Sequence, residues 1–404
     1  MCRSTIDGQV SAPTVCQNPA VTHAHAHAAP AAAPAPAENV RPLELFFDLV
    51  FVFAITQIAS VLAVHPNGEG LARVVVLLAL TWWMYAGYAW LTNALDLERT
   101  RPRLLLLTGM AAFFVMSLAV PRSFDPGPWG LVLGSAYLVV VLVHTVGFLG
   151  TSGRAGIARI GPLNLLSALM VLAAGALPAS WRLGVLALAC VVQVMTPFLV
   201  GTGGFTVGAG HFVERHGLAV IILLGESIVE VGTAAGKAAS PATVLPGALL
   251  ALALSAAMWW LYFDREERAS ETYLDRVPPE RRPRVAVYAF GYAYLVMILG
   301  IAVSAVGMQE AIGSFDRPLE GLRWLLLSLG AGLYLLGLAC FHRVLAGSWP
   351  WLRLAGVVAM ALAAPAALWV GGWLALALTT TLLVALLLTE SAEETGRWRR
   401  PARR

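Results

Sequence analysis

The chain has 404 residues, of which 58% are hydrophobic and only 12% are charged. A typical soluble domain carries about 25% charged residues, so this composition excludes an ordinary soluble enzyme. The net charge is +4, and the basic residues lie in short breaks between apolar stretches rather than along one face of a polar domain. We therefore expect no nucleic-acid partner.

The first 40 residues are rich in alanine, proline and histidine and end in AAPAAAPAPAEN. Such a segment cannot bury a hydrophobic core, so residues 1–40 are predicted to form a disordered cytoplasmic tail. Its alternating histidines, His23, His25 and His27, could bind a transition metal weakly, or they could reflect the biased composition alone. No basic stretch followed by an apolar core marks a cleavable signal peptide.

The cysteines give no sign of a metal site. Cys2 and Cys16 lie in the polar tail, whereas Cys190 and Cys340 lie in apolar stretches. They form neither a CxxC pair nor a Cys/His zinc spacing. The sequence therefore predicts no metal and no cofactor.

From residue 43 onward, apolar stretches of about 20 residues alternate with short polar breaks. About 20 apolar residues cross the hydrocarbon core of a bilayer as a helix, so the sequence predicts an all-α, polytopic transmembrane bundle. Pro365 and the sequence GGW at Gly371–Trp373 leave open whether the last apolar stretch is one span or two. Counted as two, the twelve expected spans are 43–64, 71–95, 103–120, 129–149, 160–178, 182–200, 212–233, 243–263, 285–307, 321–341, 351–370 and 372–390.

The distribution of basic residues tests this count, because cytoplasmic loops carry an excess of Lys and Arg. With the N-terminus placed in the cytoplasm, 21 of the 27 basic residues fall on the cytoplasmic side and 6 on the other. The loop at 264–284 and the tail at 397–404 carry much of this bias. We therefore expect a multi-pass membrane protein with both termini in the cytoplasm.

Short matches recur in the same order along the chain and predict an internal duplication. TWWMYAGYAW in the second stretch corresponds to MWWLYFD in the eighth, SFD follows both the third and the ninth, and His144 and His342 lie near the ends of the fourth and tenth. The predicted six-span halves are residues 41–205 and 206–390, followed by a basic cytoplasmic tail at 391–404. Because six is even, both halves would point the same way, as in parallel transporter repeats.

Charged residues open the first apolar stretch, RPLELFFDLVFVFAITQIASVL, at Arg41, Glu44 and Asp48. Glu44 and Asp48 are four residues apart and share a helix face. An interfacial helix start accounts for Arg41 and Glu44, because acidic groups in the first turn suit the helix dipole. Asp48 lies one turn deeper among phenylalanines, which favours a buried partner or a functional site.

Two other spans carry polar residues where they are expected to reach the cytoplasm. The second stretch ends in WLTNALDLERTR, with Asn93 and Asp96, and the eighth ends in WWLYFDRE, with Asp264 at the matching depth. A solvated helix end explains these residues as well as a site does.

The seventh stretch, HFVERHGLAVIILLGESIVEVG, carries charges both at its head and in its interior. His211, Glu214 and Arg215 lie at the cytoplasmic end. Glu226 follows twelve residues after Glu214, which is ~18 Å deeper at 1.5 Å per residue, and Glu230 comes one turn later on the same face. Carboxylates inside a membrane are functional-site candidates, although a protonated glutamic acid hydrogen-bonded between helices would also fit.

The first and seventh stretches thus begin at the same depth with charges that need partners. We expect Arg41, Glu44 or Asp48 to contact Glu214 or Arg215. Such a contact would make a polar gate on the cytoplasmic side.

The segments RPLELFFDLVFVFAITQI and HFVERHGLAVIILLGESI, together with WLTNALDLER and the WWLYFD ending, closely resemble the bacterial low-temperature-requirement A family of integral membrane proteins. The resemblance covers about residues 41–390 and implies a protein of the bacterial inner membrane. The family name refers to a cold-growth phenotype, and the resemblance implies no settled substrate or reaction. Glu230 stands where the family pattern would have a small residue. The residues that match the family motifs are Arg41, Glu44, Phe47, Asp48, Thr56, Gln57, Asn93, Asp96, His211, Glu214, Arg215, Gly225 and Glu226.

The first helix also resembles that of a potassium-channel family built from six-helix repeats. That family carries Phe-Ser-Asp followed by an AIT stretch that lines the pore. Here Phe47 and Asp48 are adjacent, so the serine is missing, and ERHGLAVIILLGE in the second half does not repeat the pattern.

Together these features predict a transporter or channel for a small solute or ion, with Glu226 and Glu230 as an intramembrane protonation or cation site. An intramembrane enzyme acting on a lipid or isoprenoid stays open, because paired carboxylates and His211 could supply acid–base groups. Against an enzyme, the sequence contains no Asp-rich diphosphate motif and no nucleophile–base arrangement. A non-catalytic membrane scaffold or sensor is the third alternative. Membrane lipids are the expected surroundings, and the substrate, the energy coupling and the oligomeric state stay open.

Overall fold

The computed structural model describes residues 41–236 and 241–398. Every regular element among these residues is helical, and the described helices belong to one compact unit. The predictions for the tail at 1–40, including its alternating histidines, and for residues 399–404 concern residues outside the described ranges. The all-α fold class predicted from the sequence is confirmed.

Twelve of the described helices are long and apolar enough to cross a membrane, as expected. A chain within lipid must satisfy its backbone hydrogen bonds internally, and a helix does so segment by segment. The helices are α1 (Pro42–Val64), α2 (Gly68–Ala94), α3 (Thr100–Ala119), η1 (Val120–Arg122), α4 (Trp129–Leu149), α5 (Arg154–Ala176), α6 (Ala179–Val200), α7 (Ala209–Ala235), α8 (Pro241–Phe263), α9 (Glu266–Arg276), α10 (Arg282–Ala286), η2 (Val287–Ala293), α11 (Tyr294–Gly313), α12 (Arg323–Ala346), α13 (Trp351–Ala363), η3 (Ala364–Leu368) and α14 (Gly372–Trp398).

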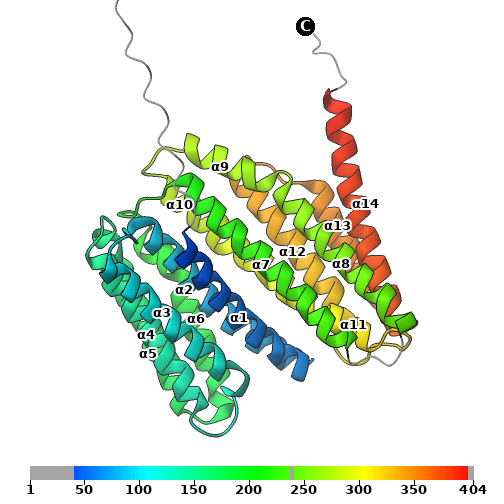
Figure 1. Ribbon diagram of the computed structural model, residues 1–404, viewed down its shortest axis with the longest axis horizontal. Coiled ribbons are helices and arrows are strands. Elements are labelled where there is room, and N and C mark those ends of the chain that lie inside the picture. The colour runs from blue at the N-terminus through cyan, green and yellow to red at the C-terminus, as the bar shows by residue number, and fades with distance from the viewer. Residues whose placement is uncertain (1–40, 237–240, 399–404) are drawn as a thin grey trace, which may run out of the picture. The chain divides into compact units, whose positions relative to one another are not determined.

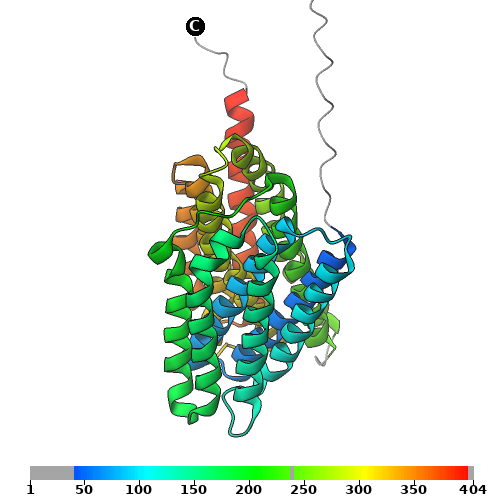
Figure 2. The same ribbon diagram turned by 90° about the vertical axis from the view of Figure 1, so that its left-hand side faces the viewer.

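Helices α1 and α7 pack against each other in the middle of the bundle (Figure 1). Helices α3, α4, α5 and α6 lie on the α1 side, and α8, α12, α13 and α14 lie on the α7 side. Figure 2 shows the long helices running roughly parallel, with their connections gathered at the two ends. We call the end where α1 and α7 begin the near end and the opposite end the far end.

The last apolar stretch forms two spans, which settles the point that the sequence left open. The short η3 helix ends at Leu368, and α14 begins at Gly372. Gly371 has φ +147°, a conformation that side chains disfavour. A Cβ atom on Gly372 would lie 2.1 Å from the Ala311 carbonyl oxygen on α11. The turn therefore needs both glycines.

The polar segment at 264–284, expected as a loop, contains helix α9. Glu266, Ser270 and Leu274 are buried and four residues apart, so they share one helix face that packs on the bundle. The exposed positions between them carry charges, and this amphipathic pattern stabilises a helix lying across the near end of the bundle (Figure 1). The sequence did not predict this helix, because its many charged residues obscured the four-residue spacing of the buried positions.

The two halves pack their helices in the same order. Helix α1 contacts α2 and α3, and α3 leads through α4 to α5; helix α7 contacts α8 and α11, and α11 leads through α12 to α13. Two structural repeats would give this correspondence, and the duplication itself stays a prediction.

Candidate functional site

Helix α1 carries a line of polar residues along the face that meets α7. Glu44, Asp48 and Thr56 each contact a side chain of α7, and Ser60 lines a cavity that α1 and α7 share. Glu44 and Asp48 are fully buried, whereas Thr56 and Ser60 are half-buried. The line therefore runs ~24 Å along the helix axis, from near the first turn to the last.

Helix α7 carries the matching line. His211 and Arg215 lie four residues apart, and Glu226 follows eleven residues after Arg215, which is about three turns. Glu230 continues the same face one turn further. Both helices thus place polar groups at their near and far portions, with an apolar interval between them.

At the near end, Arg215 joins the two carboxylates of α1. Its Nη1 atom lies 3.1 Å from Glu44 Oε1, and its Nη2 atom lies 3.3 Å from Asp48 Oδ1. The Arg215 side chain is entirely buried. On the other side of Glu44, His211 Nε2 lies 3.0 Å from Oε2. Buried charges persist only when they are paired, and this cluster supplies the pairing.

Neutral groups from α2 complete the cluster. The Tyr85 hydroxyl donates to Asp48 Oδ1 at 3.0 Å, and the Thr92 hydroxyl contacts the Arg215 guanidinium. The Asn93 amide lies 3.3 Å from His211 Nδ1. These three residues sit on the last turns of α2, so the near-end cluster ties α1, α2 and α7 together. We call Glu44, Asp48, His211 and Arg215, with these neighbours, the near-end cluster.

The charges of the near-end cluster do not balance by themselves. Two carboxylates, Glu44 and Asp48, face one permanent cation, Arg215. Arg41 lines the cavity beside Glu44 and adds a second permanent cation. Asp48 Oδ2 is buried without a hydrogen-bond partner among the described residues.

A cavity of about 260 Å³ opens onto the near-end cluster. Arg41, Glu44, Asn93, Asp96 and His211 are among the side chains that line it. Among these side chains Asp96 is exposed, His211 is half-buried and Glu44 is fully buried.

An apolar interval follows along α1. Phe51, Val52 and Ile55 are buried, and the Phe51 ring stacks on Tyr85 with 3.8 Å between the ring centroids. On α7 the facing interval includes Leu223, which is also buried. This packed section separates the near-end cluster from the polar groups at the far end.

At the far end, a larger cavity of about 370 Å³ lies between α1, α7 and α11. The Thr56 hydroxyl donates to Glu226 Oε1 at 3.0 Å across the α1–α7 contact. Glu230, Ser60 and Gln309 also line this cavity, and Glu230 Oε2 has no hydrogen-bond partner among the described residues. We call this space the far-end cavity.

The expected contact between the two helix heads is present, through Arg215 with Glu44 and Asp48. Other expected members lie elsewhere. Glu214 is exposed. Asp96 is exposed beside Arg99, although it lines the near-end cavity. Asp264 lies at the end of α8 against α14 and pairs with its neighbour Arg265.

A second buried charge cluster was not expected from the sequence. Arg353 Nη1 on α13 lies 2.6 Å from Glu266 Oε1 on α9, and Arg353 Nε lies 2.9 Å from Glu390 Oε1 on α14. His342 on α12 approaches the same Glu266 oxygen at 3.3 Å. The sequence gave little indication of this cluster, because Arg353 looks like an ordinary basic residue in a connection between two spans. No group of three or more His, Cys, Asp or Glu within residues 41–236 and 241–398 is placed to hold a metal ion.

Comparison with known proteins agrees with the resemblance of the motif segments. The chain is 29% identical over 334 residues to an uncharacterized protein of Rhizobium meliloti (strain 1021), a match that covers 78% of this chain and 80% of the relative. No solved structure matches. The sequence model of the family described as bacterial low temperature requirement A protein (LtrA) matches residues 39–388. The chain, a multi-pass bundle of membrane-spanning helices, therefore belongs to the bacterial low temperature requirement A protein family.

Proposed function

We propose that the protein conducts or transports a small cation, or a solute coupled to a proton, along the contact between α1 and α7. One observation carries this proposal: polar groups face each other on both helices at the two ends of the contact, each end opens to a cavity, and the interval between them is packed. A path of this kind needs only a limited movement of α1 against α7 to open.

The proposed membrane is the bacterial inner membrane, with the near end in the cytoplasm. The support comes from the sequence, since most basic residues belong to connections at the near end. On this orientation the near-end cluster faces the cytoplasm and the far-end cavity faces the opposite side.

The near-end cluster would act as the cytoplasmic gate. Its single guanidinium holds Glu44 and Asp48 on α1 against α7, and the near-end cavity is lined by both acidic and basic side chains. Protonation of Glu44 or Asp48 would remove the ion pair of that carboxylate with Arg215 and loosen the contact between α1 and α7. The gate would thereby respond to the ion that it admits.

The far-end cavity would hold the transported cation or proton. Glu226 and Glu230 lie one turn apart, so their carboxylates share the cavity. Two carboxylates close together hold a proton or a cation more readily than either alone, because the second negative charge opposes ionisation of the pair. Thr56 and Gln309 add neutral ligands of the kind that a dehydrated cation requires.

An enzyme acting on a lipid or isoprenoid is the alternative from another class. It would use His211 and Glu44 as acid–base groups. The geometry favours this less, because Glu44 is held by Arg215 and by the Arg41 backbone N–H at 3.0 Å, which leaves it little freedom to accept a substrate proton. A scaffold or sensor would need no far-end carboxylates at all.

Glu226→Gln tests the proposal. The variant keeps the hydrogen bond to Thr56 but removes the titrating group, so we expect normal insertion and yield with cation or proton flux reduced at least tenfold. Flux is measured in proteoliposomes with a trapped pH-sensitive dye under an imposed membrane potential, with sodium or potassium as the external cation. Glu280→Gln, an exposed carboxylate in the connection before α10, is the matched control and should conduct like the unaltered protein. Wild-type flux that equals that of empty liposomes, or a silent Glu226→Gln variant, would refute the proposal.

A further inference from the structure

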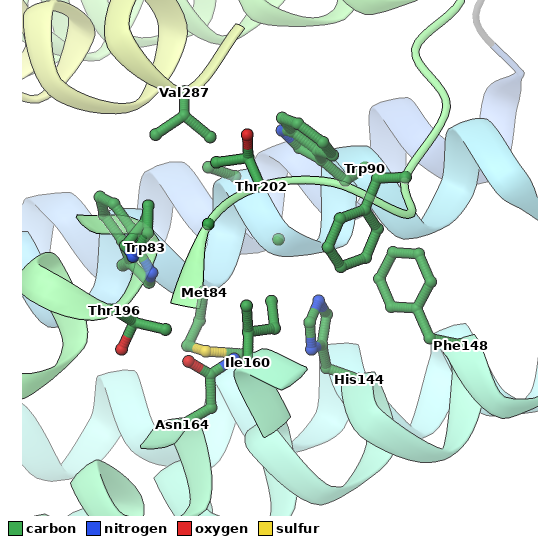
Figure 3. A pocket seen from close by; sticks show the side chains of 15 residues that line it. Trp83, Met84, Trp90, His144, Phe148, Ile160, Asn164, Thr196, Thr202 and Val287 are labelled. Carbon is green, nitrogen blue, oxygen red and sulfur yellow. The ribbon is translucent and has the colours of Figure 1, made fainter. Parts of the chain in front are cut away.

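Apart from the α1–α7 contact, the bundle contains a third space, bounded by α2, α4, α5, α6 and η2 (Figure 3). Its volume is about 80 Å³, and it is open on one side. We propose that this space is a binding site for a small uncharged ring compound that bears a hydroxyl group. The site is distinct from the transport path and does not depend on it.

Aromatic side chains make the walls. Trp83 and Trp90 come from α2, Phe148 from α4, and Phe205 from the connection between α6 and α7. Phe148 and Phe205 meet edge to face with 5.2 Å between centroids, and Trp90 meets Phe205 in the same way at 5.6 Å. Walls of this kind favour a flat, apolar ligand, because a ring can stack or pack edgewise against them.

Two buried polar side chains contribute to the same space without partners of their own. His144 and Asn164 are each 2% exposed. The His144 ring lies against the Gly87 backbone, but neither of its nitrogens has a partner in hydrogen-bond geometry among the described residues, and Asn164 Oδ1 has none. Burying a polar atom without a hydrogen-bond partner lowers the stability of the folded state. A ligand that satisfied these atoms would recover that stability.

The chemistry of these two side chains selects a hydroxyl group. A neutral imidazole offers one donor and one acceptor, and an amide oxygen only accepts. A hydroxyl group can accept from the imidazole N–H and can donate to an amide oxygen, so it is able to satisfy either side chain. A ketone could satisfy only the donor. No Asp, Glu, Lys or Arg lines the space, so a charged ligand would be buried without a counter-ion.

The size limits the ligand to a single ring or end group. An enclosed apolar cavity of ~150 Å³ takes up benzene, and this space is about half as large but open. The π-helical segment η2 lies beside it through Val287, and the neighbouring Tyr292 packs on Trp83. Such π segments are frequent at functional sites because they misalign a helix locally.

Photolabelling tests the proposal. A phenol that carries a diazirine is applied from the buffer to the protein in lipid nanodiscs, and a second phenol with a long alkyl chain is included in the lipid. We expect covalent labelling of the peptides around Trp83–Trp90 and His144–Phe148. Labelling by the first probe indicates that the ligand enters from water, and labelling by the second indicates that it enters from the membrane. Unlabelled phenol should protect these peptides, toluene should protect about tenfold less well, and benzoate should not protect.

Three variants make the test specific. Ile160→Phe fills the space and should abolish the protected labelling. His144→Phe keeps a ring but removes the hydrogen bonds, so protection by phenol should weaken about tenfold. Ser167→Ala is the control: Ser167 lies on the same helix as Asn164 but donates to the Ala189 carbonyl oxygen outside the space, and it should leave labelling unchanged.

The ligand comparison on the unaltered protein does not depend on any variant folding. Labelling that phenol fails to protect, or that toluene and benzoate protect as well as phenol does, would overturn the proposal. If the space holds only water molecules, phenol will fail to protect these peptides from labelling.

Discussion

Arg215 is the residue on which the near-end cluster depends. It is the only permanent cation in contact with Glu44 and Asp48 within the described part of the chain, and all three side chains are buried. Its ring contacts reinforce this position, with the guanidinium carbon 5.5 Å from the centroid of Phe47. Removing this one side chain would leave two carboxylates in an apolar setting.

We therefore expect Arg215→Met to destabilise the protein by about 3–5 kcal/mol, the usual cost of breaking a buried ion pair from one side. Stability is measured by chemical unfolding in detergent, followed by tryptophan fluorescence. Arg99→Met is the matched control, because Arg99 pairs with Asp96 in an exposed position and such pairs contribute little. Equal stability of the two variants would show that the buried pairing does not hold the helices together.

The sequence predicted this pairing but not its surroundings. Glu44, Asp48 and Arg215 could be identified because charges in an apolar segment are rare and need partners at the same depth. Tyr85 and Thr92 could not, since they look like ordinary residues of an aromatic-rich helix. Only the packing of α2 against α1 and α7 decides which of its faces meets the carboxylates.

At the scale of helices, small residues set how closely neighbours approach. Helices α4 and α5 cross where Gly130 meets Gly175, and a Cβ atom on Gly175 would lie 2.2 Å from the Gly130 carbonyl oxygen. Close backbone approach of this kind is a common mode of helix association in membranes, where the hydrophobic effect offers no drive between helices. Sequence alone indicated the spans but not which glycines mediate their contacts.

Gly175→Ala should therefore destabilise the bundle, by about 1–3 kcal/mol for an overpacked contact. Gly184→Ala on α6 is the control, because nothing lies within 4 Å of its Cβ position, and alanine there should be neutral or up to ~1 kcal/mol stabilising. Thermal aggregation in detergent, compared across the two variants, checks the prediction. A Gly175→Ala protein as stable as Gly184→Ala would show that α4 can shift away from α5 without cost.

For the whole molecule, the sequence predicted the number of spans correctly, because span length is fixed by bilayer thickness. Several boundaries differ: α5 begins at Arg154 rather than 160, and α11 ends at Gly313 rather than 307. The sequence did not predict α9 or the cluster of Arg353 with Glu266 and Glu390, which links α9 to α13 and α14. That cluster and the near-end cluster lie at the same end of the bundle, since α13 begins and α14 ends there after regular alternation of the spans. Buried ion pairs thus link helices from both halves of the chain at the near end.

The last prediction concerns the orientation of the bundle in the membrane. The near end carries most of the basic connections, so it should lie in the cytoplasm, where positive loops are retained. A fluorescent reporter inserted next to Glu271 on α9, or fused after Arg404, should therefore be active. An alkaline phosphatase inserted at Pro126, between η1 and α4, should also be active, because that enzyme requires the periplasm. The reciprocal fusions, with the reporters exchanged, are the controls and should be silent. Phosphatase activity at Glu271 would place the near-end cluster on the periplasmic side and contradict both the orientation and the proposed cytoplasmic gate.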